Sequence, residues 1–515
     1  MFLNLGLGRM GCLVGALGIS AALDLNFASG TFPPQVTHSR SSSATQVYSD
    51  GLVDFAPENL LLYSRTLSNG AWTGSNRTIS DNTTADPPDT TNGTTADTIV
   101  ENTAAAAFHW IAQAVTKPAV AERYLFTGYC HSSSARDIAV YLQNGANGCN
   151  ARFRPSTGVN TGPAATFGSG WSSVSSSITS IGGGWHRFAL QATSDGTTSI
   201  TAQIALYNAA FSYTGDGTSG AVVYGLRLQR GTHSRAEDDF LLQTTSAAVY
   251  GPRITYDPSS LACLGYLNEP QRTNLLLNSA TLSTQNVAVS AQEYTLSFYG
   301  TGTVTLTAAS TAGPLVGTGA YPNRVTLTFT PSAGILTVTV SGSVTNAQLE
   351  AGSTASSWIP TTGTSATRAA DVAYVDVATW LPALSITNAT FYARIKANAA
   401  DISTRVMSTD AGGTSLVEIN NFFEVGSWDG TGYAGITGGL LIGNDRQVAV
   451  SLASGARVLA YGGATTSSAS NGLSATTRIY IGSEAGVSNY FNGTFAECKA
   501  FYGAQSAGQI ATLTT

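Results

Sequence analysis

The sequence predicts an all-β protein built from serial β-sandwich modules after a small N-terminal segment. Three observations lead to this prediction. Only 10% of the 515 residues are charged and 55 are glycines, which is typical of short strands joined by tight turns under a Ser/Thr/Asn surface. Thr alternates with Val or Leu in several segments, the period of a strand with one buried face. Long stretches with helical spacing are missing, and a chain of this length is expected to form about three or more domains.

The N-terminal segment is apolar and rich in glycine over residues 1–23, and Arg9 interrupts it. That charge leaves too short an apolar run for a membrane-spanning helix, so we expect no membrane insertion. We interpret the segment as an anchor packed inside an assembly; a cleaved signal peptide is the alternative, although the start lacks basic residues. Residues 1–58 are expected to form a small particle-docking domain. It is completed by residues 245–272, which likewise alternate short apolar stretches with turn residues.

An internal repeat marks the modules that follow. The sequence NLLLYS at residues 59–64 returns as NLLLNS at residues 274–279, so two modules are predicted to begin in the same way. We expect one module over residues 59–244 and a short sandwich over 273–361, where the Thr–Val alternation is cleanest. An extended linker over 362–373 leads to a last sandwich over 374–515. The only helix we expect is near the end, in residues 504–513.

Two separated segments resemble one continuous stretch of bacteriophage tail-fibre and head-spike proteins, including those of gene transfer agents. They are residues 23–52, with Ser39-Arg40, and residues 252–279, with Gln271-Arg272-Thr273-Asn274. In that family the two halves are nearly continuous, whereas here a whole module separates them. We therefore expect an insertion at a surface loop, with both halves side by side in one domain.

The inserted and C-terminal modules carry resemblances of their own. Residues 59–72, 182–190 and 213–231 look like the start, middle and end of carbohydrate-binding-module-like jelly rolls on phage proteins. Tyr224 stands where that pattern usually has Trp. Residues 479–483 and 490–502 are similar to the last strands of laminin-G or concanavalin-like sandwiches. The resemblances imply jelly-roll and concanavalin-like folds and a virion-surface location.

Candidate site residues point to binding rather than catalysis. The chain has no nucleophile elbow, zinc-protease motif, phosphate-binding loop or CxxC motif, so we expect no enzyme. Proteins bind sugars with aromatic rings, which pack against the C–H faces of the sugar, and with planar polar groups, which bond its hydroxyls. The aromatic candidates are Trp72, Trp110, Trp171, Trp185, Tyr213, Tyr224, Trp428 and Tyr490. Of these we favour Trp428 with Tyr433, which flank a polar, Gly-rich loop, and then Trp72 and Tyr224.

A cofactor is not expected, with one possible exception. Asp216, in Thr-Gly-Asp-Gly-Thr, is a candidate Ca²⁺ ligand, and an ordinary Asp-Gly turn is the alternative. Cys130 and Cys149 either pair or remain buried thiols. The net charge of −6 is spread along the chain without a basic stripe, which excludes nucleic acid as an expected partner.

Together these observations predict a virion-surface protein, a tail fibre or head spike, that attaches to host cell-surface polysaccharide. We expect a homo-oligomer, with a trimer favoured, held to other virion proteins by residues 1–58. The alternative is a purely structural tail, baseplate or head-vertex protein whose sandwiches make only protein contacts.

Overall fold

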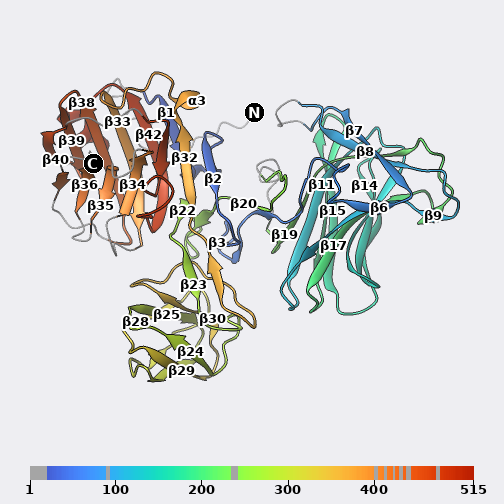
Figure 1. The fold of residues 1–515 in the computed structure, drawn as a ribbon, viewed down its shortest axis with the longest axis horizontal. Helices are drawn as coiled ribbons and strands as arrows, with labels where there is room; N and C mark the ends of the chain where they lie inside the picture. The colour runs from blue at the N-terminus through green and yellow to red at the C-terminus, as the bar shows by residue number, and fades with distance from the viewer. Residues whose placement is uncertain are drawn as a thin grey trace. The chain divides into compact units, whose positions relative to one another are not determined.

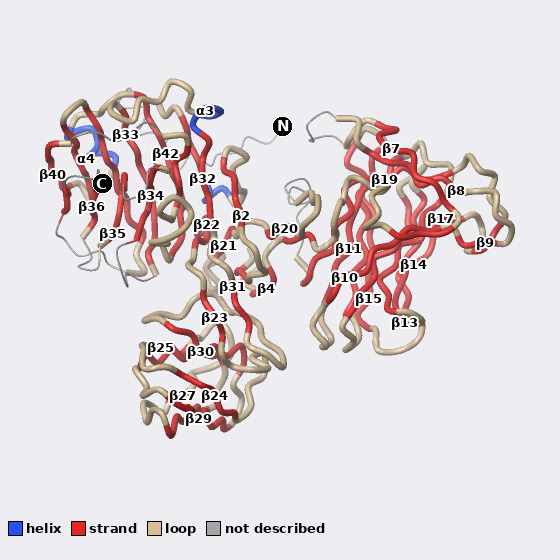
Figure 2. Tube along the Cα trace, in the orientation of Figure 1, coloured by secondary structure: helices blue, strands red, loops and turns tan. Residues whose placement is uncertain are grey.

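The computed structural model describes residues 20–87, 93–233, 242–398, 404–410, 415–420, 424–428, 433–436, 442–470 and 476–515. These residues form antiparallel β-sheets with only short helices, as Figure 2 shows, which confirms the all-β prediction. No helix among them is long and apolar enough to cross a membrane. The chain divides into two units, one from Asp54 to Gly251 and the other formed by the residues on both sides of it.

The inserted unit is a two-layer sandwich (Figure 1). Its six-stranded sheets enclose a core that includes Ile99, Phe126, Val140 and Phe188. The first sheet runs β14 (Val159–Phe167), β13 (Asn147–Arg154), β12 (Asp137–Asn144), β17 (Ser199–Tyr207), β10 (Trp110–Thr116), β6 (Thr73–Ser75). The second runs β15 (Ser172–Gly182), β16 (Trp185–Thr193), β11 (Arg123–His131), β19 (Gly220–Arg230), β8 (Ala96–Glu101), β7 (Arg77–Thr84). Two short pairs complete it: β9 (Ala107–Phe108) with β18 (Ser212–Tyr213), and β5 (Glu58–Asn59) with β20 (Val249–Tyr250).

Both ends of the inserted unit leave it side by side. Strands β5 and β20 pair antiparallel, with Glu58 opposite Tyr250, and the Gly251 N–H donates to the Pro57 carbonyl. A module whose ends are adjacent can be placed in a loop without stretching the host fold. This geometry is the one the split motif predicts.

The larger sandwich of the other unit also has two layers, around a core that includes Leu25, Phe391, Val448 and Ile481. One sheet runs β21 (Ile254–Tyr256), β22 (Cys263–Asn268), β42 (Gly493–Tyr502), β33 (Ala389–Ala397), β38 (Asp445–Ala453), β39 (Ala456–Tyr461), β40 (Ala464–Ala469), and β1 (Leu23–Asn26) also pairs with β42. The other runs β2 (Val36–Ser39), β32 (Val372–Asp376), β41 (Arg478–Ile481), β34 (Thr404–Thr409), β35 (Ser415–Ile419), β36 (Val425–Trp428), β37 (Tyr433–Ile436).

The smaller sandwich of this unit packs two sheets around Leu296, Val304, Leu336 and Leu349. Its sheets are β24 (Gln285–Val289), β29 (Gly334–Ser341), β26 (Thr303–Ala308), β27 (Leu315–Val316), and β28 (Val325–Phe329), β25 (Tyr294–Tyr299), β30 (Thr345–Ala351). The chain enters through β23 (Arg272–Asn274) and leaves through β31 (Ala366–Arg368), which pair with each other. The remaining elements are β3 (Thr45–Val47), β4 (Val53–Phe55), the short helices η1 (Phe27–Ser29) and α3 (Val377–Trp380), and α4 (Ala507–Leu513).

The N-terminal segment differs from the expected separate domain. Strands β1 and β2 are members of the two sheets of the larger sandwich, and Leu23, Leu25 and Val36 lie in its core. A segment of this length cannot bury enough apolar surface for a core of its own, so it joins a larger one. Residues 1–19, the proposed anchor, lie outside the described residues. Residues 362–373, expected as a linker, instead contribute β31 and the start of β32.

Two local predictions can be compared with the structure. The C-terminal helix is confirmed as α4, which begins with a capping box between Ser506 and Gln509. Cys130 and Cys149 are free thiols buried in the core of the inserted unit, not a disulfide. Burial raises the pKa of each thiol to about 12, which keeps both protonated and unreactive.

The repeated NLLL sequence builds the same clamp twice. The Asn59 side-chain amide donates to the Leu226 and Leu242 carbonyls, and its oxygen accepts from the Leu61 and Leu228 N–H groups.

In the smaller sandwich, Asn274 repeats the pattern. Its amide donates to the Ala347 and Ile359 carbonyls, and its oxygen accepts from the Leu276 and Leu349 N–H groups. Each asparagine therefore ties the start of its module to the last strand and to the departing chain.

Candidate functional site

Four of the candidate aromatics are core residues, namely the favoured Trp72 and Tyr224 together with Trp171 and Trp185. Trp72 is 3% exposed, packs in the main core of the inserted unit and donates its indole N–H to the Tyr63 carbonyl at 3.0 Å. Tyr224 is 2% exposed and packs with Tyr129 and Trp185. In this structure neither ring offers a free face to a ligand.

The other predicted pair is brought together. Trp428 ends β36, Tyr433 begins β37, and the two residues are direct cross-strand partners, so their side chains lie on the same face of the sheet. Tyr433 is among the exposed large side chains, and its hydroxyl is 3.1 Å from the Asn420 amide nitrogen. Partial burial, with smaller contributions from Glu418 and Glu424, raises the pKa of this hydroxyl to about 12. Residues 429–432, the rest of the predicted loop, lie outside the described residues.

Asp216 organises its own turn. One carboxylate oxygen accepts from the N–H groups of Thr218 and Ser219, and the other lies 3.1 Å from the Arg136 guanidinium. A cation would have to displace these donors, so the geometry matches the Asp-Gly turn, the alternative interpretation. Across the described ranges, no group of three or more His, Cys, Asp or Glu side chains is placed to hold a metal ion.

A surface that the sequence analysis did not single out is the outer face of the first sheet of the inserted unit. Side chains alternate between the core and this face along each strand. Across β10, β17, β12, β13 and β14 the register places one outer row as Trp110, Ala205, Ala139, Arg152, Gly162. The next row is Ala112, Gln203, Tyr141, Asn150, Ala165. We call this surface the aromatic face.

Aromatic rings on this face gather around Tyr141. Its ring centroid is 6.1 Å from those of Phe108 and Phe167 and 6.2 Å from that of Phe211. The Phe211 ring in turn lies 5.1 Å from that of Tyr207. Phe211 is 38% exposed, and the other rings except Tyr141 are half-buried. The rim of this group therefore reaches solvent, unlike the cluster around Tyr224, although its centre, Tyr141 with Ala139 and Ala205, is buried.

Planar polar groups are interleaved with these rings. The Arg152 guanidinium stacks over Tyr207 with 4.6 Å between its carbon and the ring centroid. On the same face the Gln143 side-chain amide donates to the side-chain oxygen of Gln203, a member of the second row, at 2.8 Å. Aromatic faces that pack against C–H surfaces, beside amides and a guanidinium that bond hydroxyls, are the chemistry of a saccharide site.

The sequence predicted one aromatic residue of this face as a candidate for sugar binding. Trp110 was among the aromatic candidates, but its neighbours on the face were not. In a half-exposed antiparallel strand the outward positions are usually polar. In β12 the outward positions Ala139 and Tyr141 are instead apolar or aromatic, and so are two outward positions of β17, Ala205 and Tyr207. That pattern is also typical of a strand buried on both faces, so the sequence alone did not separate the two cases.

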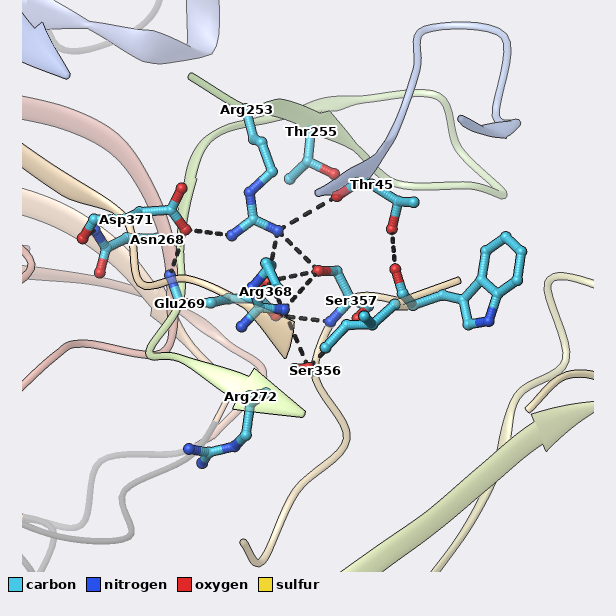
Figure 3. Close-up of polar contacts among 12 residues, drawn as sticks. Thr45, Arg253, Thr255, Asn268, Glu269, Arg272, Ser356, Ser357, Arg368 and Asp371 are labelled. Carbon is cyan, nitrogen blue, oxygen red and sulfur yellow. Dashed lines mark hydrogen bonds and ion pairs between the residues drawn. The ribbon is translucent and has the colours of Figure 1, made fainter. Parts of the chain in front are cut away.

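The split motif itself builds a buried ionic cluster in the larger unit. Figure 3 shows Arg253, Glu269, Arg368 and Asp371 turned toward one another. Arg253 bonds Glu269 at 2.6 Å and also pairs with Asp371, while Arg368 bonds Glu269 at 2.9 Å. Arg40, from the first half of the motif, reaches Asp371 at 2.8 Å. All five side chains are almost fully buried.

Charge pairing outweighs burial in this cluster. Burial disfavours the charged form of Glu269, but Arg368 and Arg253 lower the pKa of this carboxyl to about 2. In the same way Arg253 and Arg40 overcome burial and hold the pKa of Asp371 well below its usual value. The cluster therefore connects the N-terminal segment, the hairpin after the insertion and the residues just before β32.

Comparison with known proteins gives no family assignment. No protein-family model matches the chain, and no curated protein matches it. Among solved structures, a sialidase CBM40 from Ruminococcus gnavus bound to α2,3-sialyllactose is 10% identical, with a TM-score of 0.22, over 25% of this chain and 83% of that one. A putative carbohydrate-binding protein from Bacteroides ovatus is 12% identical, with a TM-score of 0.23, over 46% and 80%. The LG1-3 region of the laminin α2 chain is 7% identical, with a TM-score of 0.15, over 77% and 95%.

Proposed function

We propose that this protein binds carbohydrate without catalysis, through the aromatic face of the inserted unit. The observation that carries the proposal is the set of partly exposed rings, Trp110, Tyr207, Phe211 and Phe167, on the outer side of a sheet that already has a core on its inner side. Contiguous aromatic surface in such a position marks an interaction site. The neighbouring Arg152 and amide groups suit hydroxyl-rich ligands better than an apolar partner.

The ligand we propose is a neutral or weakly charged bacterial surface polysaccharide. The chain as a whole has few charges, so electrostatic attraction supplies little affinity and added salt should change binding little. Single sites of this kind bind weakly. Linked copies on one particle bind firmly, because each further contact forms at a high effective concentration.

The biological setting we propose is the surface of a bacteriophage-type particle. It rests on the resemblance of residues 23–52 and 252–279 to tail-fibre and head-spike proteins. In this setting a homo-oligomer, with a trimer favoured, attaches to the particle through its N-terminal residues and presents the aromatic face to the host.

The binding proposal is tested with the purified full chain on an array of bacterial polysaccharides. Trp110→Ala and Tyr207→Ala each remove one ring and should weaken binding about tenfold, the scale expected for a stacking ring. Tyr502→Ala is the matched control, because Tyr502 is an exposed aromatic of the other unit; it should bind as the wild type does. Equal binding by all three variants, with their folding intact, would refute the aromatic face as the site.

The attachment proposal needs a separate experiment. Particles that carry the chain without residues 54–251 should adsorb to host cells more slowly than intact particles. If they adsorb equally fast, the inserted unit is not the receptor binder. If the wild type also binds no glycan, the structural alternative, in which the aromatic face contacts another protein of the particle, takes its place.

A further inference from the structure

The larger unit contains a pocket of about 330 Å³ that is separate from the aromatic face. It lies where the chain around β3, the hairpin of β21 and β22, the segment after β30 and the end of β33 meet. Its lining includes Gln46, Tyr256, Glu269, Arg324, Trp358 and Lys396. The buried ionic cluster reaches this pocket through Glu269.

Several polar atoms of this wall have no hydrogen-bond partner among the described residues. Gln46 is 2% exposed, and neither its amide nitrogen nor its oxygen makes a hydrogen bond to any residue that the structure describes. The Nε1 of Trp358 and the Nε of Arg324 are likewise buried and unpartnered. A buried polar group without a partner destabilises the fold, and such groups are rare in native proteins. The Gln46 amide lacks both a donor and an acceptor partner, so it suits a ligand with adjacent hydroxyl groups, one of which accepts from its NH2 while the other donates to its oxygen.

The pocket also carries uncompensated positive charge. The Arg324 guanidinium bonds the Ser356 carbonyl at 2.6 Å and the Ser297 hydroxyl at 2.8 Å, but none of the carboxylates within the described ranges. Lys396 is half-buried and forms no ion pair within the described part of the chain.

The acidic groups near these cations have other partners, and Asp445, directly opposite Lys396 on β38, is mostly exposed and lies 3.6 Å from Arg394. The one acidic side chain among the lining residues, Glu269, is already paired with Arg253 and Arg368. Asp257, close enough to feel the charge of Lys396, instead accepts from the N–H groups of Ser259 and Ser260. A ligand carboxylate would complete the charge balance.

The walls supply the remaining element of recognition. Trp358 and Tyr256 are half-buried aromatic side chains, and their rings can cover the C–H face of a pyranose. We propose that this pocket binds one carboxylate-bearing sugar residue, of the uronic-acid or sialic-acid class. Lys396 and Arg324 attract its carboxylate, and Gln46 bonds its hydroxyls. The proposal does not depend on the aromatic face.

The test uses the full chain and ligand-observed NMR with glucuronate and N-acetylneuraminate, with glucose and acetate as comparison ligands. The acidic sugars should bind, glucose and acetate should bind at least tenfold more weakly, and added salt should weaken the acidic sugars. Equal binding of glucose would overturn the role of the cations. Equal binding of acetate would overturn the role of the sugar ring.

Variants locate the site. Lys396→Met keeps the aliphatic stem of the side chain and should weaken glucuronate binding about tenfold. Gln46→Glu should abolish glucuronate binding, because the new carboxylate repels the carboxylate of the ligand. Arg446→Met, on the neighbouring strand β38 and outside the pocket, is the matched control and should bind normally. Unchanged binding by Lys396→Met and Gln46→Glu, with wild-type melting temperatures, would refute the proposal. Trp110→Ala should leave this binding intact, so the two sites fail independently.

Discussion

At the scale of single residues, the most informative side chains are two asparagines. Asn59 and Asn274 each satisfy two carbonyl and two N–H groups of the backbone at a module boundary. The repeat in the sequence predicted that two modules begin alike. It did not show why, because the partners of each asparagine lie in the last strand and the exit segment of its module.

Replacing one clamp should destabilise one module only. Asn274→Ala leaves four buried backbone groups without this partner, and we expect a loss of at least about 2 kcal/mol in the smaller sandwich. Asn59→Ala should do the same to the inserted unit. Hydrogen exchange followed by mass spectrometry resolves the modules. Asn286→Ala, at an exposed position of β24 in the same sandwich, is the control and should have little effect; an equally small effect of Asn274→Ala would contradict the clamp.

The buried ionic cluster should make the larger unit sensitive to acid. The pKa of Glu269 is lowered to about 2 and that of Asp371 is also lowered. The stability they contribute is present above their ordinary values, about 4, and is lost as pH falls toward 2. Burial also lowers the pKa of His38 from 6.5. Its neutral form is therefore favoured in the fold, and protonating it costs stability as pH falls below that value.

Hydrogen exchange at pH 7, 5 and 3 checks this prediction. Protection of the backbone amides of the larger sandwich from exchange should decrease as the pH is lowered from 7 to 3. Asp371→Asn should lose about 3–5 kcal/mol at pH 7, because it leaves Arg253 and Arg40 buried without that carboxylate. Asp445→Asn removes a mostly exposed carboxylate 3.6 Å from Arg394 and should cost less than about 1 kcal/mol. Equal losses in the two variants would show that burial of the cluster does not matter.

At the scale of secondary-structure elements, the first described strand belongs to the last sandwich. β1 pairs with β42, with Leu23 opposite Ala500 and Leu25 opposite Cys498. The alternation in the sequence shows which residues of such a strand are buried. It does not show which strand is its neighbour, because strand pairing has no local signal.

Leu25→Ala should therefore destabilise the C-terminal sandwich rather than a separate N-terminal domain. Leu25 is 1% exposed, and truncating a buried leucine typically costs about 2–5 kcal/mol. Hydrogen exchange in β33 and β42 should report the loss. Leu52→Ala, at a side chain that is 56% exposed, is the control and should change little. If β42 keeps its full protection in Leu25→Ala, the first strand is dispensable to that core.

At the scale of the whole molecule, the chain is one folded unit that carries another in a loop. The inserted unit begins and ends at the paired strands β5 and β20. We call the residues on both sides of the insertion, 1–53 and 252–515, the host unit. The ionic cluster that joins both halves of the split motif lies entirely in this unit, where Arg40 bonds Asp371 although the two residues are 331 positions apart. Folding of the host unit thus depends on residues from both sides of the insertion.

Removing residues 54–251 and joining their neighbours with a short Gly-Ser linker should leave the host unit folded. Its own core and ionic cluster are complete without the insertion. Circular dichroism and thermal unfolding of the shortened chain should show a β-protein with one cooperative transition. The isolated residues 54–251 should give a second folded β-protein. A shortened chain that fails to fold would show that the two units are mutually dependent.

Local chemistry in the sequence determined much of this protein. Period-two alternation, abundant glycine and few charges predicted antiparallel sandwiches; the NLLL repeat marked two module starts; and the split motif located the insertion. These signals are local because strand periodicity and turn chemistry depend on neighbouring residues. Only the tertiary structure decided which faces are covered: Trp72 and Tyr224 became core, whereas Trp110 and Tyr207 stayed partly exposed. Alternation assigns side chains to two faces of a strand, but the covering of each face depends on chain segments far away in the sequence.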